Sequence, residues 1–288
     1  MGTAPGPEHL ERGDKPQVTA SVKLLEVENL GKTYPLPAGG SHTAAQAITF
    51  TLNPGGALGI VGESGSGKTT VARMLVGLVR PDHGTIKVDG TVRPPKPPRG
   101  RTARLARARQ IQMVFQDPYV SLDPRLTAEQ CLRSALRLHG RDASLATELL
   151  DRVGLGAREA TALPRRLSGG QRQRLAIARA LAVDPRILVL DEAVAALDVS
   201  IQAQILGLLD EIRRDTGVAL VFVSHDLAVV QHVTDEVLVM RQGRAVEQGP
   251  TRRVLTAPTD PYTRLLLASV PGEGWDPADA VTARAALT

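Results

Sequence analysis

The chain of 288 residues has a single cysteine, few aromatic residues and no long hydrophobic run. One cysteine, Cys131, excludes an internal disulfide framework and a multi-cysteine metal site within one chain, and it favours a reducing compartment. Aromatic residues make up only 2% of the chain, so the core has to be built mainly from Leu, Val, Ile and Ala, which the 42% hydrophobic content supplies. The longest apolar run, residues 218–223, is far shorter than the ~20 residues of a membrane-spanning helix.

The N-terminal segment is rich in Pro, Gly and charge and lacks the apolar centre of a secretion signal. We therefore expect residues 1–20 to be a disordered tail and the protein to be cytoplasmic, with any membrane role exerted through partner chains. The net charge of +5 is concentrated in one segment, residues 91–109, which combines prolines with several arginines. A solvated loop leading into an exposed helix is the favoured interpretation, and contact with anionic lipid or a basic-patch partner is the alternative.

Short strand-like segments alternate with helical patterns along most of the chain. This alternation predicts an α/β architecture with a largely parallel sheet. A longer helical stretch, residues 127–155, interrupts the alternation and indicates an inserted helical lobe. Strands are predicted at 21–27, 47–52, 57–61, 85–88, 111–115, 187–190 and 218–223, and helices at 69–78, 175–183 and 201–214.

One glycine-rich segment, residues 62–69, fits the phosphate-loop pattern G-x-x-x-x-G-K-[ST]. Its glycines allow the backbone N–H groups to turn towards phosphate oxygens, while Lys68 supplies a positive charge and Thr69 a hydroxyl for Mg²⁺. A chance glycine turn is the alternative, but a predicted strand before it and a helix after it favour phosphate binding. The predicted nucleotide-binding residues here are Gly62, Glu63, Ser64, Gly65, Ser66, Gly67, Lys68, Thr69 and Thr70.

Four polar residues follow predicted strands and can meet at one edge of the sheet. Asp191 and Glu192 end an all-apolar strand, and their side chains alternate in direction, which allows Asp191 to hold Mg²⁺ and Glu192 to activate a water molecule. Gln116 and His225 each follow another strand, where they can reach Mg²⁺, the attacking water or the terminal phosphate. Taken alone, each would be an ordinary strand-end residue, but the phosphate loop upstream favours the catalytic interpretation.

Between these motifs lies Leu167-Ser168-Gly169-Gly170-Gln171, which resembles the signature segment of ATP-binding cassette (ABC) ATPases. With the phosphate loop, Gln116, the acidic pair, residues 196–198 and His225, it completes that family's motif set in the family's order. The resemblance covers roughly residues 22–270.

That resemblance implies a P-loop NTPase core with a mixed, largely parallel sheet, an inserted helical subdomain at about 117–167 and a C-terminal extension. It implies an ATPase domain over residues 21–270, followed by a tail at 271–288. It also implies ATP and Mg²⁺ as cofactors, with Tyr34 stacking on adenine and Thr69, Gln116 and Asp191 near the metal. Glu192, His225 and Gln116 are the implied catalytic residues. Ser168, Gly169, Gly170 and Gln171 are expected to complete the ATP site of a second cassette chain.

A narrower resemblance concerns three further segments, residues 115–125, 246–249 and 258–266. They look like the corresponding regions of oligopeptide, dipeptide and nickel importer ATPases. This implies a peripheral protein on the cytoplasmic face of the membrane that works with permease subunits and an extracytoplasmic binding protein. Peptides are the expected solute, with nickel, opines and other small solutes as alternatives, and the second cassette can be identical or different. No nucleic-acid partner is expected.

The run after Glu192 departs from the family pattern. Ala193, Val194 and Ala195 stand where the family usually has a proline and hydroxyl residues. We expect this to free the backbone after Glu192 and to affect turnover rather than nucleotide binding. Two other functions remain open: a non-transport nucleotide switch, against which the single cassette and the absence of sustained heptads argue, and the ATPase of an exporter.

Overall fold

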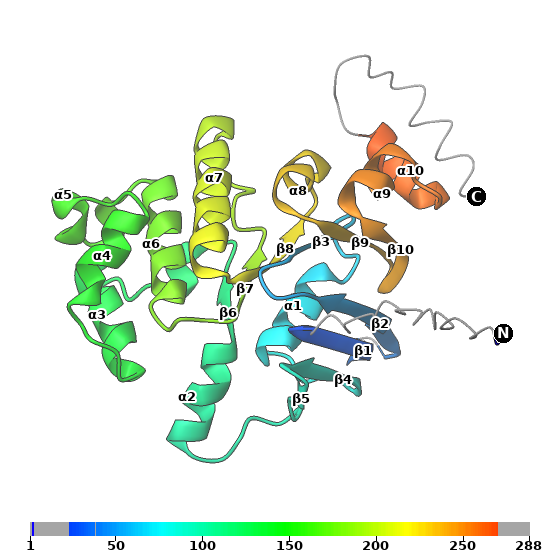
Figure 1. The fold of residues 1–288 in the computed structure, drawn as a ribbon, viewed down its shortest axis with the longest axis horizontal. Helices are drawn as coiled ribbons and strands as arrows, with labels where there is room; N and C mark the ends of the chain where they lie inside the picture. Colours follow the sequence, from blue (N-terminus) through cyan, green and yellow to red (C-terminus); the bar gives the residue numbers. More distant parts are fainter. Residues whose placement is uncertain (1, 3–22, 38, 270–288) are drawn as a thin grey trace.

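The computed structural model describes residues 2, 23–37 and 39–269, arranged around two β-sheets (Figure 1). Apart from Gly2, the predicted tails at 1–20 and 271–288 lie outside the described residues. Strands and helices alternate along much of the chain, as the sequence patterns predict. Within the described part of the chain, no helix has the length and apolar character needed to cross a membrane.

The larger sheet has six strands in the order β10-β9-β3-β8-β7-β6. All neighbouring pairs in it are parallel except β9 and β10, which are antiparallel. The expected α/β fold with a mixed, largely parallel sheet is confirmed. The strands are β3 (Ala57–Val61), β6 (Ile111–Val114), β7 (Ile187–Asp191), β8 (Ala219–Ser224), β9 (Glu236–Arg241) and β10 (Arg244–Pro250).

A second, antiparallel sheet of four strands was not predicted as a separate unit. It runs in the order β2-β1-β4-β5, from β1 (Leu25–Pro35), β2 (Ser41–Leu52), β4 (His83–Val88) and β5 (Thr91–Val92). The predicted strand at 21–27 covers only the start of β1. The rest of β1 was missed because its pairing with β2 shifts register after Val27. Asn29 has φ 55°, so the alternation of side chains is broken within one continuous strand.

Helix α1 (Lys68–Val76) lies between the two sheets (Figure 1). Its buried residues Val71 and Leu75 belong to one apolar cluster that also contains Phe50 of β2 and Val189 of β7. The opposite face of the six-stranded sheet is covered by α6 (Gly169–Leu181), α7 (Val199–Thr216), α8 (Leu227–Val233) and α9 (Thr251–Thr256). The all-apolar strands are thus buried on both faces, as their sequences predict.

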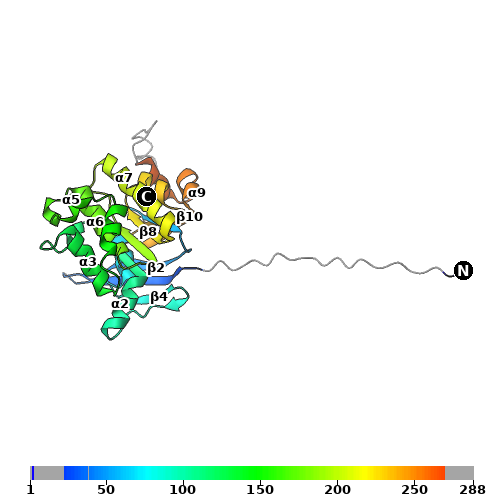
Figure 2. The same cartoon turned by 60° about the vertical axis from the view of Figure 1, so that its left-hand side comes forward.

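A group of short helices projects to one side of the sheets (Figures 1 and 2). It consists of α3 (Ala128–Leu138), α4 (Leu145–Arg152) and α5 (Ala157–Ala160), with the 3-10 turns η1 (Pro118–Val120) and η2 (Pro164–Arg166). Its buried leucines, such as Leu132 and Leu149, share a core with α6. Helices therefore occur where the inserted lobe is expected, whereas its boundaries at 117 and 167 stay a prediction. We call this group of helices, α3 to α5, the helical lobe.

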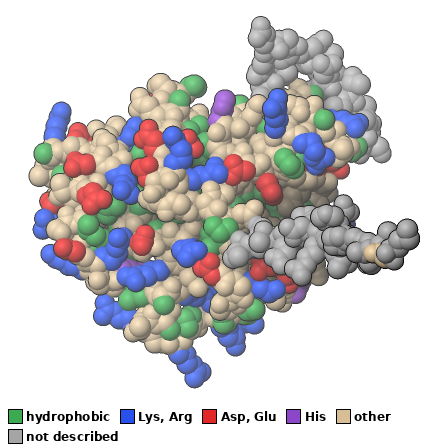
Figure 3. All heavy atoms as spheres, viewed as in Figure 1, with side chains coloured by type: hydrophobic (Ala, Val, Ile, Leu, Met, Phe, Trp, Pro, Cys, Tyr) green, Lys and Arg blue, Asp and Glu red, His purple; other side chains and the backbone are tan. Residues whose placement is uncertain are grey.

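The Pro- and Arg-rich segment leads into helix α2 (Arg101–Gln110), none of whose residues is buried. The expected loop followed by an exposed helix is confirmed. Lys and Arg side chains stand out at the end of the molecule where α2 lies (Figure 3). Arg93 is the exception within the segment, since it is only 7% exposed and donates to the carbonyl of Leu75 at the end of α1.

The C-terminal part contains α9 and α10 (Pro261–Ala268), which were not predicted as helices. Asp260 caps α10 by accepting a hydrogen bond of 2.8 Å from the N–H of Tyr262, and Pro261 occupies its first turn. An Asp-Pro start is a helix signal, but the eight residues that follow are too short for a clear helical period.

Candidate functional site

The phosphate-loop segment joins β3 to α1, and its backbone is held in a conformation that only glycine adopts freely. Gly62 has φ 147° and Gly67 has φ 103°. A Cβ atom at Gly67 would lie 2.0 Å from the carbonyl oxygen of Ala44, and one at Gly62 would lie 2.1 Å from that of Met240. The loop is therefore packed against β2 and against the end of β9, and side chains at these two positions are excluded.

The turn between β9 and β10 is hydrogen-bonded to the phosphate loop. The N–H of Gly243 donates to the carbonyl of Ser66 at 2.9 Å, and the carbonyl of Gly243 accepts from the N–H of Gln46. The loop is thus connected to strands that come both before and after it in the chain. None of these supports was predicted, because backbone hydrogen bonds between distant segments leave no residue-type signal.

Lys68 is buried and its ammonium group folds back over the loop. Its Nζ donates to the carbonyl oxygens of Gly62 at 2.7 Å and Glu63 at 2.9 Å. Burial lowers the pKa of Lys68, while the nearby carboxylates of Glu192 and Asp191 oppose that shift. A buried cation at the start of a helix, within reach of loop carbonyls, is placed to interact with phosphate oxygens.

The hydroxyl oxygen of Thr69 and a carboxylate oxygen of Asp191 lie close together beside the phosphate loop. The hydroxyl of Thr69 donates to Oδ1 of Asp191 at 3.0 Å, and Asp191 is only 5% exposed. Burial raises the pKa of Asp191, and the bond from Thr69 partly offsets this. Oxygen donors of this kind suit Mg²⁺, which takes few protein ligands and completes its shell with water and phosphate. The donor set thus fits the predicted metal.

Glu192 has an unusual backbone conformation for a non-glycine residue, with φ 48°. Its N–H donates to the carbonyl of Val223 at 3.0 Å, which fixes it to the neighbouring strand β8. Its carboxylate Oε1 lies 3.4 Å from Nδ1 of His225. Strained conformations of this kind persist where the surroundings enforce them, and they concentrate at functional sites.

One cavity of about 360 Å³ is lined by half of the predicted nucleotide-binding residues. Its volume falls within the range of roughly 300–1,000 Å³ that is typical of small-ligand sites. It unites the loop with Tyr34 of β1, with Gln116 after β6 and with Glu192 after β7. The lining residues are Tyr34, His42, Ala44, Ser64, Gly65, Gly67, Lys68, Thr69, Thr70, Gln116 and Glu192.

Sequence reasoning missed two of these residues, His42 and Ala44. His42 is the cross-strand partner of Tyr34 in the β1–β2 pair. A hairpin was recognisable from the Pro- and Gly-rich residues 35–40, which separate two strand-like segments. Pairing across that hairpin would have placed His42 beside the predicted adenine-binding residue.

The segment Ser168 to Gln171 does not line this cavity. It forms the first turn of α6, where the N–H of Gln171 donates to the Ser168 hydroxyl at 3.2 Å and Oε1 of Gln171 accepts from the N–H of Ser168 at 2.9 Å. This capping box leaves Ser168 exposed at a helix N-terminus. Gly170 is packed so closely that a Cβ atom would lie 2.6 Å from a methyl carbon of Ile201.

A second cavity of about 330 Å³ adjoins the first, and Gln116 lines both. It lies between the segment after β6 and the start of α6, and it is mostly apolar. The guanidinium of Arg172 stacks over the ring of Tyr119, 4.8 Å from its centroid. The lining residues are Gln116, Asp117, Pro118, Tyr119, Gly169, Arg172, Gln173, Ala193, Ala196 and Leu197.

The residues after Glu192 are restrained without the family's proline. Ala193 and Val194 are only 3% and 2% exposed and belong to the core beneath α6 and α7. Two tight turns follow, with the N–H of Ala195 donating to Glu192 and that of Leu197 donating to Val194, each at 3.2 Å. The expectation of a freed backbone is therefore wrong for this stretch, because burial and turn hydrogen bonds replace the restraint that the ring would give.

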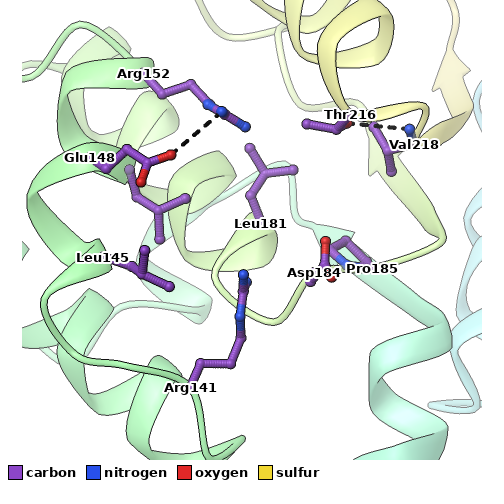
Figure 4. Close-up of a pocket in the computed structure, with 10 residues that line it drawn as sticks. Arg141, Leu145, Glu148, Arg152, Leu181, Asp184, Pro185, Thr216 and Val218 are labelled. Carbon is purple, nitrogen blue, oxygen red and sulfur yellow. Dashed lines mark hydrogen bonds and ion pairs between the residues drawn. The ribbon is translucent and has the colours of Figure 1, made fainter.

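A third, much smaller cavity lies between the helical lobe, the end of α6 and the segment that joins α7 to β8 (Figure 4). Its volume is about 90 Å³, too small for a nucleotide, and no predicted site residue lines it. Arg141 from the lobe reaches across and donates to the carbonyl of Ala182 at the end of α6 at 2.9 Å. This cavity marks the joint between two parts of the fold.

Comparisons with known proteins place these features in context. The family model described as ABC transporter matches residues 45–195. A probable peptide ABC transporter ATP-binding protein, y4tS of Sinorhizobium fredii, is 47% identical over 264 residues, covering 87% of this chain and 73% of that protein. The glutathione import ATP-binding protein GsiA of Escherichia coli K12 is 46% identical over 263 residues, but this chain spans only 41% of its length.

Solved structures show the same fold. A dimeric ATP-binding cassette, MJ0796, in a post-hydrolysis state bound to ADP and Pi, superposes with a TM-score of 0.70 at 29% identity, covering 79% of this chain and 99% of that one. The cassette cbiO1 of Clostridium perfringens, part of an ABC transporter complex, gives a TM-score of 0.69 at 28% identity, covering 82% and 91%.

Proposed function

The chain belongs to the ABC transporter family, as an ATP hydrolase, and from this we propose that it energises uptake of peptides or a related small solute through partner permeases. The observation that carries the ATPase part is the single cavity in which the phosphate loop, Tyr34, Gln116 and Glu192 meet. The importer part is supported by the names of the relatives, a peptide transporter subunit and a glutathione import protein, each similar over at least 86% of this chain.

The proposed roles follow from position and chemistry, for the residues that line the cavity and for Asp191 and His225, which contact the lining residues Thr69 and Glu192. Backbone N–H groups of the phosphate loop and the ammonium of Lys68 bind the phosphates, and Tyr34 packs on the adenine. Thr69, Asp191 and Gln116 hold Mg²⁺, which neutralises charge on the phosphates when bound. Glu192 accepts the proton of the attacking water, and His225, 3.4 Å from its carboxylate, orients that group towards the terminal phosphate.

The proposed site is completed by a second cassette. Ser168 and Gly170 start a helix whose free N–H groups attract an anion, yet they do not line the cavity of their own chain. A partner chain, identical or related, presents its own Ser168 segment to the phosphates from the other side. The dimeric state of the MJ0796 cassette supports this arrangement.

We propose that the protein acts on the cytoplasmic face of the membrane, where permease subunits receive the movement of the cassettes and an extracytoplasmic binding protein delivers the solute. A non-transport switch and an exporter ATPase are the competing functions. Uptake of a labelled peptide by cells lacking this chain, with and without the chain restored, separates them. Restored uptake supports the importer, and unchanged uptake of peptides, glutathione and nickel would contradict it.

The catalytic assignment is tested with Glu192→Gln. The amide keeps the shape of the side chain but gives up most of its basicity, so turnover should fall at least about 100-fold while ATP binding is retained. Lys68→Ala, the comparison variant, should instead weaken nucleotide binding itself. ATPase rates and equilibrium binding of ATP are the measurements, and a wild-type hydrolysis rate in Glu192→Gln would sink the assignment.

A further inference from the structure

Helix α10 contacts the phosphate loop through Tyr262. Tyr262 in α10 is only 2% exposed, and its hydroxyl accepts a hydrogen bond of 3.1 Å from the backbone N–H of Glu63, 199 residues away in the chain. The side chain of Glu63 itself points to solvent and is exposed. The contact is therefore made to the backbone of the loop, independent of the residue type at position 63.

The peptide unit that Tyr262 contacts is also the one that Lys68 contacts. Its N–H, from Glu63, donates to the phenol, and its carbonyl, from Gly62, accepts from Nζ of Lys68 at 2.7 Å. The Gly62–Glu63 peptide is thus held at both ends. Hydrogen bonds in such a chain polarise one another, so the two bonds strengthen together.

Tyr262 is itself held firmly. The guanidinium of Arg241, at the end of β9, lies over its ring at 5.0 Å from the centroid. Burial raises the pKa of the Tyr262 phenol above its usual value, so the hydroxyl is neutral at neutral pH. The phenol is thus a fixed, uncharged support on the outer side of the loop.

The helix that carries Tyr262 is anchored to the sheet by a buried carboxylate. Glu247 of β10 is 7% exposed and accepts hydrogen bonds from the N–H and hydroxyl of Thr259, at 3.0 and 2.8 Å, and from the N–H of Asp260 at 3.2 Å. Asp260 then caps α10 through the N–H of Tyr262. A continuous set of contacts runs from β10 through the start of α10 to the loop.

We propose that Tyr262 is a positioning residue for nucleotide binding: its hydroxyl fixes the Gly62–Glu63 peptide and so keeps the phosphate loop and Lys68 in the shape that receives phosphates. The inference rests on the proposed role of residues 62–69 in binding nucleotide. A loop already in its bound shape loses less conformational freedom when the ligand arrives, which raises affinity. Tyr262 does not line the cavity proposed to bind nucleotide, so its loss should affect binding more than chemistry.

The test is Tyr262→Phe, which removes only the hydroxyl. One neutral hydrogen bond corresponds to roughly a 3- to 10-fold change in an equilibrium constant. We expect the Kd for ADP, measured by calorimetry, and the KM for ATP to rise by about that factor, with kcat changed less than about twofold. Thr256→Val is the matched control, because the Thr256 hydroxyl donates to the carbonyl of Arg252 within α9, away from the loop.

The outcomes separate the inference from the function on which it rests. If wild-type protein fails to bind ADP, the proposed nucleotide site fails and the inference with it. If wild-type protein binds ADP and Tyr262→Phe binds it equally well, only the positioning role is wrong. A loss of thermal stability without a change in Kd or KM would contradict the positioning role in the same way.

A second measurement covers the case in which the variant does not fold. In wild-type protein without nucleotide, hydrogen–deuterium exchange of the segment that contains Glu63 should be slow, because its amide is bonded to a buried phenol. Exchange at the rate of an open loop would overturn the proposal. Where Tyr262→Phe does fold, the same segment should exchange faster than in Thr256→Val.

Discussion

At the scale of single residues, the site depends on positions where the backbone could take almost no other residue. A Cβ atom at Gly67 would clash with the carbonyl oxygen of Ala44, and one at Gly62 with that of Met240. Glu192 has a positive φ although it is not glycine. The first two are constraints of space and the third is a constraint enforced by neighbours. Such positions are where a single substitution has its largest effect.

Gly67→Ala tests the spatial constraint, with Gly65→Ala as its control. Both residues have positive φ, but a Cβ at Gly65 meets nothing within 4 Å, whereas one at Gly67 meets a carbonyl oxygen at 2.0 Å. Strain alone should cost Gly65→Ala about 1 kcal/mol of unfolding free energy, and the added clash should cost Gly67→Ala at least about 1 kcal/mol more. Denaturant unfolding measures both, and equal losses would contradict the packing argument.

Sequence reasoning named about half of its candidate site residues at positions that the structure brings together, because local chemistry marks those positions. The phosphate loop, Gln116 and Glu192 carry recognisable residue types at strand ends, and the structure gathers them in one cavity. His42, Tyr262 and the β9–β10 turn were missed because their contribution depends on pairing between distant segments. The antiparallel sheet was missed for a related reason, since shifts of register in β1 hide its side-chain alternation.

At the scale of elements, the segment from Gln116 to η1 connects the nucleotide cavity to the helical lobe. Gln116 lines two adjoining cavities, and Tyr119 follows it under the guanidinium of Arg172. A change at the terminal phosphate can therefore be passed to α6 and the lobe through a short, packed connection. Leu122, further along, is only 4% exposed, so substituting it would disturb the core rather than test this connection.

Tyr119→Ala tests the connection. Removing the ring should abolish most of the solute uptake while basal ATPase activity stays within about twofold, because Tyr119 is 42% exposed and lies outside the nucleotide cavity. Tyr119→Phe keeps the ring beneath Arg172 and should transport normally. Uptake and ATPase rates are measured on the same preparations, and parallel loss of both in a folded Tyr119→Ala would argue for a catalytic role.

The carboxylate of Glu247, which anchors the start of α10, should make the stability of the protein depend on pH. Burial alone would raise the pKa of Glu247, but hydrogen bonds from Thr259 and Asp260 hold it below its usual value of 4.5. A lowered folded-state pKa means that the stabilisation is complete above the unfolded pKa, about 4.5, and is lost as the pH falls through the lower folded value. Glu247→Gln should therefore be less stable by about 1–3 kcal/mol at neutral pH.

That difference should shrink as the solution is acidified below about pH 4.5, because the wild-type carboxylate then becomes protonated too. Thermal unfolding of both proteins across the pH range is the measurement. A stability gap that is constant with pH would show that the charge of Glu247 is not what holds the extension.

At the scale of the whole molecule, the proposal is that each ATP site is shared between two chains. The phosphate loop lines the cavity, whereas the Ser168 segment, at the start of α6, does not. Two chains can pair so that each supplies what the other lacks, whether or not they are identical. The high similarity to a dimeric cassette makes this the arrangement to test first.

Mixing two inactive variants tests shared sites. Ser168→Arg blocks the signature side and Lys68→Ala the phosphate-loop side, so a mixed pair has one intact composite site and one doubly damaged site. ATPase activity should reappear on mixing, to at most about half of the wild-type rate per mixed dimer. No recovery, with mixed dimers demonstrated by mass, would count against sites that work singly, and full activity from a proven monomer would remove the dimer requirement.

The 199 residues between Glu63 and Tyr262 also set an order of events during synthesis. A ribosome adds about 5–20 residues per second, so roughly 10–40 s pass between the making of the loop and the making of its last support. Met240 and Gly243, which contact the phosphate loop, are also synthesised long after it. We therefore expect a nascent chain with a finished glycine loop to bind nucleotide more weakly until residues 240–262 have been translated.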